Sequence, residues 1–193
     1  MGRREEILTA ARDAFVKYGI AKITLEDIAN ECGLKKTALY YYFKNKDEIL
    51  AEMITDVILK MQDVVKTEVA KGETAKEKLK IFMSTKFELM QKNINLIKLF
   101  EDERMSHSAR EFMKERERCL TDFDFRLIHD ILVMGKENQK LSHQVTDSLV
   151  LMVMGVIYGS FFGKIFEGAD WDLDAMINTT IDVIFNGIEN KVN

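Results

Sequence analysis

Residues 24–50 read TLEDIANECGLKKTALYYYFKNKDEIL. Thr24 and Asp27 have the spacing of a helical capping box, in which two side chains satisfy the unpaired backbone N–H groups at a helix start. Gly33 supplies the left-handed conformation in which helices commonly end. We therefore predict a short helix between these signals and a second helix directly after it, from about residue 35 to 43. Two short helices joined by a tight turn are typical of a helix-turn-helix, whose second helix enters the DNA major groove.

This second helix, the recognition helix, has one apolar face and one face of cations and hydroxyl groups. Leu39 and Phe43 are four residues apart, so they share a face and anchor the helix inward. Because successive residues turn by roughly 100°, Tyr40, Tyr41 and Tyr42 cannot all be buried on that face. Lysines neutralise phosphates, hydroxyls donate to phosphate oxygens, and rings pack on sugars and thymine methyls. The outward face therefore favours DNA recognition over the alternative, a solvated surface on which a tyrosine covers a neighbour.

Residues 5–50, about a quarter of the chain, closely resemble the signature of TetR-family regulators. The runs Thr24–Ala29, Tyr40–Phe43 and Lys44–Leu50 occur in the family's order and register. Beyond residue 50 the chain resembles the family only in length and helical character, as expected where C-terminal domains diverge.

The resemblance implies an all-α fold with two domains. Residues 1–47 would form an N-terminal three-helix helix-turn-helix DNA-binding domain, and residues 48–193 a larger helical effector-binding and dimerisation domain. The composition agrees, because a chain with no proline and ten glycines has little of the turn punctuation that strand-rich folds need. A hydrophobic content of 47% with 31% charged residues is typical of a globular protein.

Carried over residue by residue, the resemblance also implies the DNA contacts. Thr24 would bind a phosphate at a helix start, where free backbone N–H groups attract an anion, and Lys46 would clamp another phosphate. The predicted contacts to base edges come from Lys35, Lys36, Thr37 and Ala38. The predicted contacts to the groove wall and the DNA backbone come from Tyr40, Tyr41 and Tyr42. Family members usually have Ser in place of Lys35, so the recognition helix lacks a side-chain N-cap worth about 1 kcal/mol. They often have Gly-Thr in place of Thr37-Ala38.

Methionine and phenylalanine concentrate in the C-terminal part of the chain. Ten of the eleven methionines and ten of the twelve phenylalanines lie after residue 50. Methionine adapts to irregular apolar contents, so a hydrophobic effector pocket is one hypothesis and an ordinary helical core is the other. The TetR resemblance favours the pocket. Its predicted lining residues are Met83, Phe87, Met90, Phe123, Leu127 and Met152.

Two C-terminal segments, about 146–166 and 172–189, predict a dimer interface. Gly155, Gly159 and Gly163 recur every four residues and form a small-residue ridge that lets another helix approach closely. The stripe of Ile177, Ile181 and Ile184 would pack beside it. Paired across a two-fold axis, the two helices would make a four-helix interface.

Several classes of protein do not fit the sequence. It has no Gly-rich phosphate loop, H-E-x-x-H motif or nucleophile elbow, so we predict no enzyme. Three scattered histidines and two distant cysteines predict no metal site, and we expect no cofactor. The most apolar run, Leu149 to Gly163, is shorter than the roughly 20 residues that span a bilayer. With no secretory signal at its start, the chain is expected to be cytoplasmic and without a membrane partner.

We therefore predict a homodimeric transcriptional repressor that binds a near-palindromic double-stranded operator and is released by a small hydrophobic effector. The net charge of −4 means that DNA contact must come from a local cluster. A constitutive DNA-organising protein of the same fold, without an inducer, is the first alternative. The second is a helical enzyme or binding module whose N-terminal domain has lost its DNA function.

Overall fold

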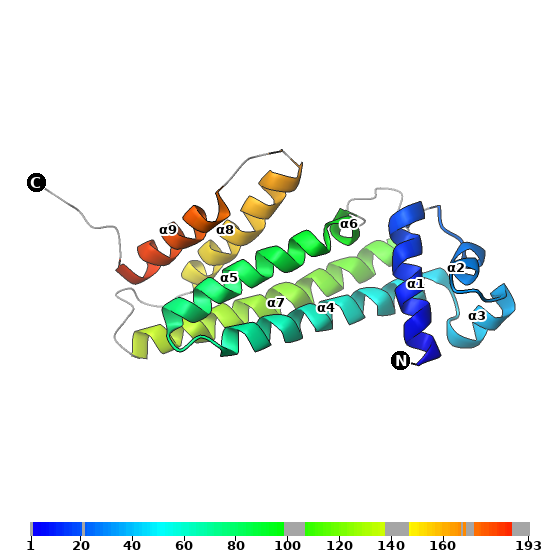
Figure 1. Ribbon diagram of the computed structural model, residues 1–193, viewed down its shortest axis with the longest axis horizontal. Helices are drawn as coiled ribbons and strands as arrows, with labels where there is room; N and C mark the ends of the chain where they lie inside the picture. The colour runs from blue at the N-terminus through cyan, green and yellow to red at the C-terminus, as the bar shows by residue number, and fades with distance from the viewer. Residues whose placement is uncertain are drawn as a thin grey trace, which may run out of the picture. The chain divides into compact units, whose positions relative to one another are not determined.

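The computed structural model describes residues 2–20, 22–98, 107–137, 147–166, 168 and 172–186. Over these ranges the chain forms helices and no strand, which confirms the predicted all-α class. In chain order (Figure 1) the helices are α1 (Arg3–Tyr18), α2 (Leu25–Glu31), α3 (Lys36–Tyr42), α4 (Lys46–Ala70), α5 (Ala75–Lys92), α6 (Ile94–Ile97), α7 (His107–Glu137), α8 (Asp147–Phe166) and α9 (Leu173–Asn186).

The described helices group into two compact units. Unit 1 comprises Met1–Met61 and Asn93–Leu120, and unit 2 comprises Gln62–Lys92 and Thr121–Asn193. Two unit boundaries fall inside α4 and α7, so each of these helices contributes residues to both units, and the third follows the end of α5. The predicted domain boundary at residues 47 and 48 falls at the start of α4 and stays a prediction.

Unit 1 contains the helix-turn-helix. Helix α1 packs against α2, and α2 packs against α3. The turn between α2 and α3 depends on Gly33, whose φ of 64° is strained for any residue with a Cβ. The Leu34 N–H closes this turn by donating to the Ala29 carbonyl at 2.8 Å. The helices meet over a buried apolar core of Ile7, Ala11, Phe15, Ile20, Ile28, Leu39, Phe43 and Ile49.

Unit 2 is a helical bundle in which α5 packs against both α8 and α9. Helix α5 begins at a capping box, because the Glu77 N–H donates to Thr74 Oγ1 at 3.2 Å and the Thr74 N–H donates to Glu77 Oε2 at 3.1 Å. In the core, the rings of Phe87 and Phe161 meet edge to face at 5.8 Å between centroids. No helix in the described ranges has both the length and the apolar character that crossing a bilayer requires.

One helix differs from its sequence prediction. Apolar spacing predicts a segment from Leu96 to about Arg104, whereas α6 is a single turn at Ile94–Ile97. Leu96 is the one fully buried residue of this turn, so the turn contributes a single side chain to the core. The rest of the predicted segment, from residue 99 on, lies outside the described residues.

Candidate nucleic-acid interface

Helix α3 presents its tyrosines and lysines outward, as the sequence predicts. Tyr41 is 86% exposed and Tyr40 is 51% exposed, whereas Leu39 and Phe43 are buried in the core of unit 1. The ring of Tyr41 meets the half-buried ring of Tyr42 edge to face at 5.3 Å between centroids. The two inward anchors therefore hold the helix so that two phenol groups stand free on its outer face.

The other predicted base-contacting residues lie on the same short segment. Lys35, Lys36 and Thr37 are exposed, and Ala38 is half-buried. Lys35 occupies the N-cap position and its side chain makes no capping hydrogen bond, as its divergence from the family's Ser predicts. The start of α3 thus presents two exposed cationic side chains, Lys35 and Lys36, which can neutralise phosphates.

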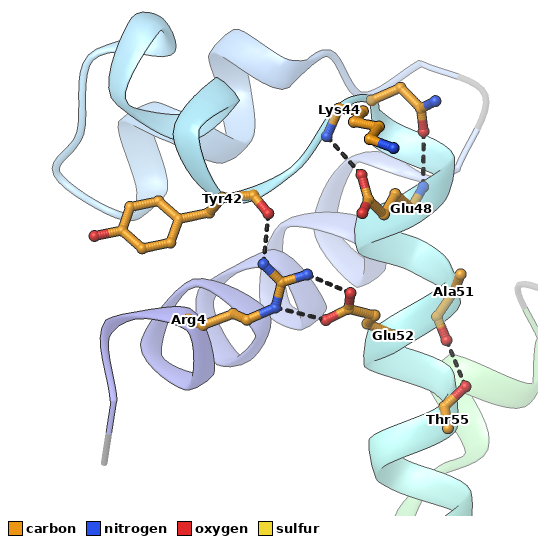
Figure 2. Close-up of polar contacts among 8 residues, drawn as sticks. Arg4, Tyr42, Lys44, Glu48, Ala51, Glu52 and Thr55 are labelled. Atoms are coloured by element: carbon orange, nitrogen blue, oxygen red, sulfur yellow. Dashed lines mark hydrogen bonds and ion pairs between the residues drawn. The ribbon is translucent and has the colours of Figure 1, made fainter.

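The C-terminal end of α3 is fixed by Arg4 of α1 (Figure 2). The Arg4 guanidinium pairs with both carboxylate oxygens of Glu52 in α4, with Nε 2.9 Å from Oε2, and donates a further hydrogen bond to the Tyr42 carbonyl. The guanidinium also lies over the Phe43 ring, 4.2 Å from its centroid. One side chain therefore joins α1, the end of α3 and α4, and so sets the direction of the recognition helix within unit 1.

The start of α4 is capped next to this contact. The Glu48 N–H donates to Asn45 Oδ1 at 2.8 Å, and the Lys44 N–H donates to the Glu48 carboxylate at 2.6 Å (Figure 2). The sequence did not single out Arg4, because its partners are 38 and 48 residues away in the chain.

Thr24 forms the predicted capping box of α2. Its Oγ1 accepts from the Asp27 N–H at 3.2 Å and donates to Asp27 Oδ2 at 2.7 Å. The hydrogen bonds that the Asp27 carboxylate accepts from the Thr24 hydroxyl and the Thr24 N–H hold the pKa of this carboxyl below its ordinary value. A phosphate at Thr24 must share the hydroxyl with this carboxylate, so phosphate binding there depends on the backbone N–H groups as well.

Lys46 has structural partners inside unit 1. Its ammonium donates to the carbonyls of Ile20 at 2.7 Å and Ile23 at 3.1 Å, in the connection between α1 and α2. An ammonium has three donors, so these two bonds are compatible with a phosphate contact through the third. Lys46 thereby ties the start of α4 to the α1–α2 connection.

Comparison with protein families agrees with this geometry. Residues 7–53 match the model described as bacterial regulatory proteins, tetR family. Residues 7–53 belong to the tetR family of bacterial regulatory domains. The match covers most of α1, all of α2 and α3 and the beginning of α4. Helix α3 and the residue before it carry the exposed tyrosines and lysines. TetR-family proteins are DNA-binding regulators rather than enzymes.

Several known proteins are similar to the chain over nearly its whole length. The fatty acid metabolism regulator protein of Bacillus subtilis is 24% identical over 187 residues, which cover 96% of this chain and 95% of that protein. A crystal structure of the transcriptional regulator FadR from Bacillus subtilis with stearoyl-CoA has a TM-score of 0.73 at 23% identity, covering 96% of this chain and 99% of that one. A structure of AibR with isovaleryl coenzyme A and operator DNA has a TM-score of 0.60 at 14% identity, covering 95% and 98%.

The predicted effector-pocket residues divide into two groups. Met83, Phe87 and Met90 of α5 are buried in unit 2, and Phe123 and Leu127 of α7 are half-buried. Met152 of α8 differs, because its side chain is 65% exposed and so is not enclosed by its own chain. The sequence does not indicate that Met152 is exposed, because α8 has apolar residues on nearly every side and so has no polar face that would identify its solvent side.

The predicted dimer-interface residues divide in the same way. Gly155 and Gly159 are exposed on α8, and a Cβ added at either would meet nothing within 4 Å; Gly163 is half-buried. Ile177, Ile181 and Ile184 are buried in the core of unit 2, where α9 packs on α5. The isoleucine stripe is therefore covered within unit 2, where α9 packs on α5, and its part in a dimer interface stays a prediction.

A buried polar cluster, Lys86 of α5, Asp124 of α7 and Tyr158 of α8, was missed by sequence analysis. Lys86 is 1% exposed, Asp124 is 0% exposed, and Lys86 Nζ lies 2.6 Å from Asp124 Oδ2. The Tyr158 hydroxyl donates to the same oxygen, and Lys86 Nζ lies 5.8 Å from the Tyr158 ring centroid. Burial lowers the pKa of Lys86 and raises the pKa of Asp124, and their ion pair opposes both shifts.

Proposed function

We propose that this protein is a transcriptional repressor that binds a near-palindromic operator as a homodimer and is released by a small hydrophobic effector. The observation that carries the proposal is the outer face of α3, where Tyr40, Tyr41 and the two lysines at its start are exposed on a helix anchored by Leu39 and Phe43. Residue types of this kind bind phosphates and base edges in the major groove. Thr24, Thr37, Ala38, Tyr42 and Lys46 complete the proposed DNA-binding surface.

Homodimerisation follows from how helix-turn-helix proteins bind DNA. A two-fold dimer presents two recognition helices to successive major grooves, about 34–36 Å apart, and so requires a site of two related half-sites. The exposed face of α8 with Gly155 and Gly159 is the proposed dimer surface, because glycine lets two helices approach closely. We propose that the protein acts at its operator, in the cytoplasm.

The proposed effector is a molecule with a long apolar part. The α5 face of Met83, Phe87 and Met90 supplies adaptable apolar side chains inside unit 2. Two structurally similar regulators were solved with stearoyl-CoA and isovaleryl coenzyme A. Acyl thioesters of coenzyme A are therefore the class to test first, and these neighbours favour a ligand-responsive repressor over a constitutive DNA-organising protein.

Release from DNA requires only a modest coupling between the two sites. An effector that binds one conformation of the dimer better than another shifts the population toward it. A coupling of ~1–3 kcal/mol lowers operator affinity roughly 5- to 150-fold. The proposed effector-binding and dimerisation domain, residues 48–193, includes nearly all of α4. Effector binding can therefore act on α4, which Arg4 joins to the end of α3.

The test is operator selection followed by measured affinity. The purified protein selects bound sequences from random duplex DNA, and fluorescence anisotropy then gives Kd for wild type, for Lys36→Ala/Tyr41→Ala and for the control Lys60→Ala. Lys60 is an exposed α4 lysine paired with Asp56, and its replacement should leave Kd unchanged. The double variant should bind about 10- to 100-fold more weakly, as expected for the loss of a few contacts. Equal binding by the double variant and wild type would refute the proposed DNA surface.

A further inference from the structure

The buried polar cluster of unit 2 contains an unsatisfied acceptor. Lys86 and Tyr158 both bind Oδ2 of Asp124. The other carboxylate oxygen, Oδ1, is buried and has no hydrogen-bond partner among the residues that the structure describes. Buried carboxylate oxygens are normally paired, and an unpaired one calls for an explanation.

The surroundings of the cluster are apolar. On α5, Phe82, Met83 and Met90 are buried one helical turn from Lys86 and so share its face. On α7, Ile128 is buried one turn after Asp124. Small-molecule sites commonly have this composition, with apolar walls and a few placed polar groups that set orientation.

Stability alone does not account for the cluster. Removing two charges from water carries a desolvation cost that often exceeds the attraction between them, and apolar replacements of similar volume are often neutral or stabilising. The Lys86–Asp124 pair sits in the core where such replacements would fit, yet it leaves one oxygen unpaired. Its composition is better explained by a partner that is not part of the chain.

We propose that Asp124 Oδ1 accepts a hydrogen bond from an N–H or O–H group of the effector, so that Lys86, Asp124 and Tyr158 form the polar anchor of an otherwise apolar binding site. The inference rests on the proposed function and narrows its effector. The ligand class is an apolar chain joined to a group that carries a hydrogen-bond donor, such as a secondary amide or a hydroxyl. The pantetheine arm of an acyl-CoA carries donors of both kinds.

Two amides that differ only in the donor test the proposal. N-methyldecanamide has one N–H, and N,N-dimethyldecanamide has none. Calorimetry with the full-length wild-type protein should give a Kd about tenfold lower for the N-methyl compound, because the tertiary amide leaves Oδ1 unpaired. The comparison needs no variant, so its result does not depend on whether a substituted protein folds.

The paired variant Lys86→Met/Asp124→Leu supplies the control. It removes both charges together, so the protein should stay folded, and the two amides should then bind within about twofold of each other. Stearoyl-CoA, tested in the same series, should bind wild type more tightly than the paired variant.

The opposite results overturn the proposal. Equal affinity of wild type for the two amides, or no binding of the N-methyl compound, would assign Oδ1 to an internal water and the cluster to folding alone. Operator binding is measured on the same samples. Wild type that binds its operator but does not distinguish the amides refutes only the anchor, whereas wild type that binds no operator refutes the proposed repressor whatever the amides show.

Discussion

Arg4 and Glu52 form a two-pronged ion pair that joins α1 to α4, and the same guanidinium donates to the carbonyl of Tyr42 at the end of α3. An arginine fork holds a carboxylate in one orientation, which a lysine ammonium does not. The contact therefore sets the orientation of α3 within unit 1.

Replacement of Arg4 should weaken operator binding even where Arg4 does not contact DNA. Arg4→Ala releases the Tyr42 carbonyl and should raise Kd about fivefold, which corresponds to ~1 kcal/mol. Arg4→Lys keeps the charge but loses the fork, so it should restore only part of the affinity. Anisotropy at fixed salt gives Kd, and circular dichroism confirms folding. Full recovery of affinity by Arg4→Lys would mean that charge alone matters.

Salt dependence should separate Lys36 from Tyr41. A lysine that neutralises one phosphate releases about one counterion, so Lys36→Ala should reduce the slope of log Kd against log salt by about 0.9. Tyr41→Phe removes the hydroxyl but keeps the ring, so it should leave this slope unchanged and weaken binding by a smaller factor than Tyr41→Ala. An unchanged slope in Lys36→Ala would place Lys36 away from the phosphates.

Local signals predicted the helix-turn-helix well. The Thr24–Asp27 cap, the Gly33 turn and the inward pair of Leu39 and Phe43 are all set by residues within a few positions of one another. Arg4 escaped prediction because its partners are 38 and 48 residues away, and no local spacing encodes such a contact.

The C-terminal site was predicted less well, for a different physical reason. Periodicity indicates that a helix face is covered but not what covers it. The sequence alone therefore does not show that α5 covers the apolar stripe containing Ile177 within unit 2. On α7, the predicted pocket residues Phe123 and Leu127 are half-buried, and each lies one position before a fully buried residue, Asp124 and Ile128 respectively. Asp124 lies four residues before Ile128 and so shares its helix face. That spacing is the sequence signal that could have indicated a buried carboxylate.

Replacement of Gly33 should test the turn that positions α3. Its φ of 64° is costly for alanine, so Gly33→Ala should lower the free energy of unfolding by about 1–2 kcal/mol. Asparagine tolerates this conformation better, so Gly33→Asn should lose less. A Cβ at this position meets nothing within 4 Å, which leaves backbone strain as the cause. Urea unfolding measures the difference, and equal losses in both variants would argue against strain.

The α2 capping box should give unit 1 an acid-sensitive stability. Hydrogen bonds from Thr24 lower the pKa of Asp27 below its ordinary 3.8. The stabilisation is therefore fully present above that pH and is lost as the pH falls through the lower, folded-state pKa. Asp27→Asn should be less stable than wild type at pH 7, and the two should converge in strong acid. Asp63→Asn, at an exposed position of α4, is the control and should show no such convergence.

The buried pair of Lys86 and Asp124 should respond in opposite ways to single and paired replacement. Asp124→Ala leaves an uncompensated ammonium in the core and should cost about 3–5 kcal/mol of unfolding free energy. Lys86→Met/Asp124→Leu removes both charges and should return the protein to within about 1 kcal/mol of wild type, or above it. Chemical unfolding of both single variants and the paired variant gives the coupling between the two residues. Additive losses would mean that the two side chains do not stabilise each other, and the ion pair would then have no part in holding α5 to α7.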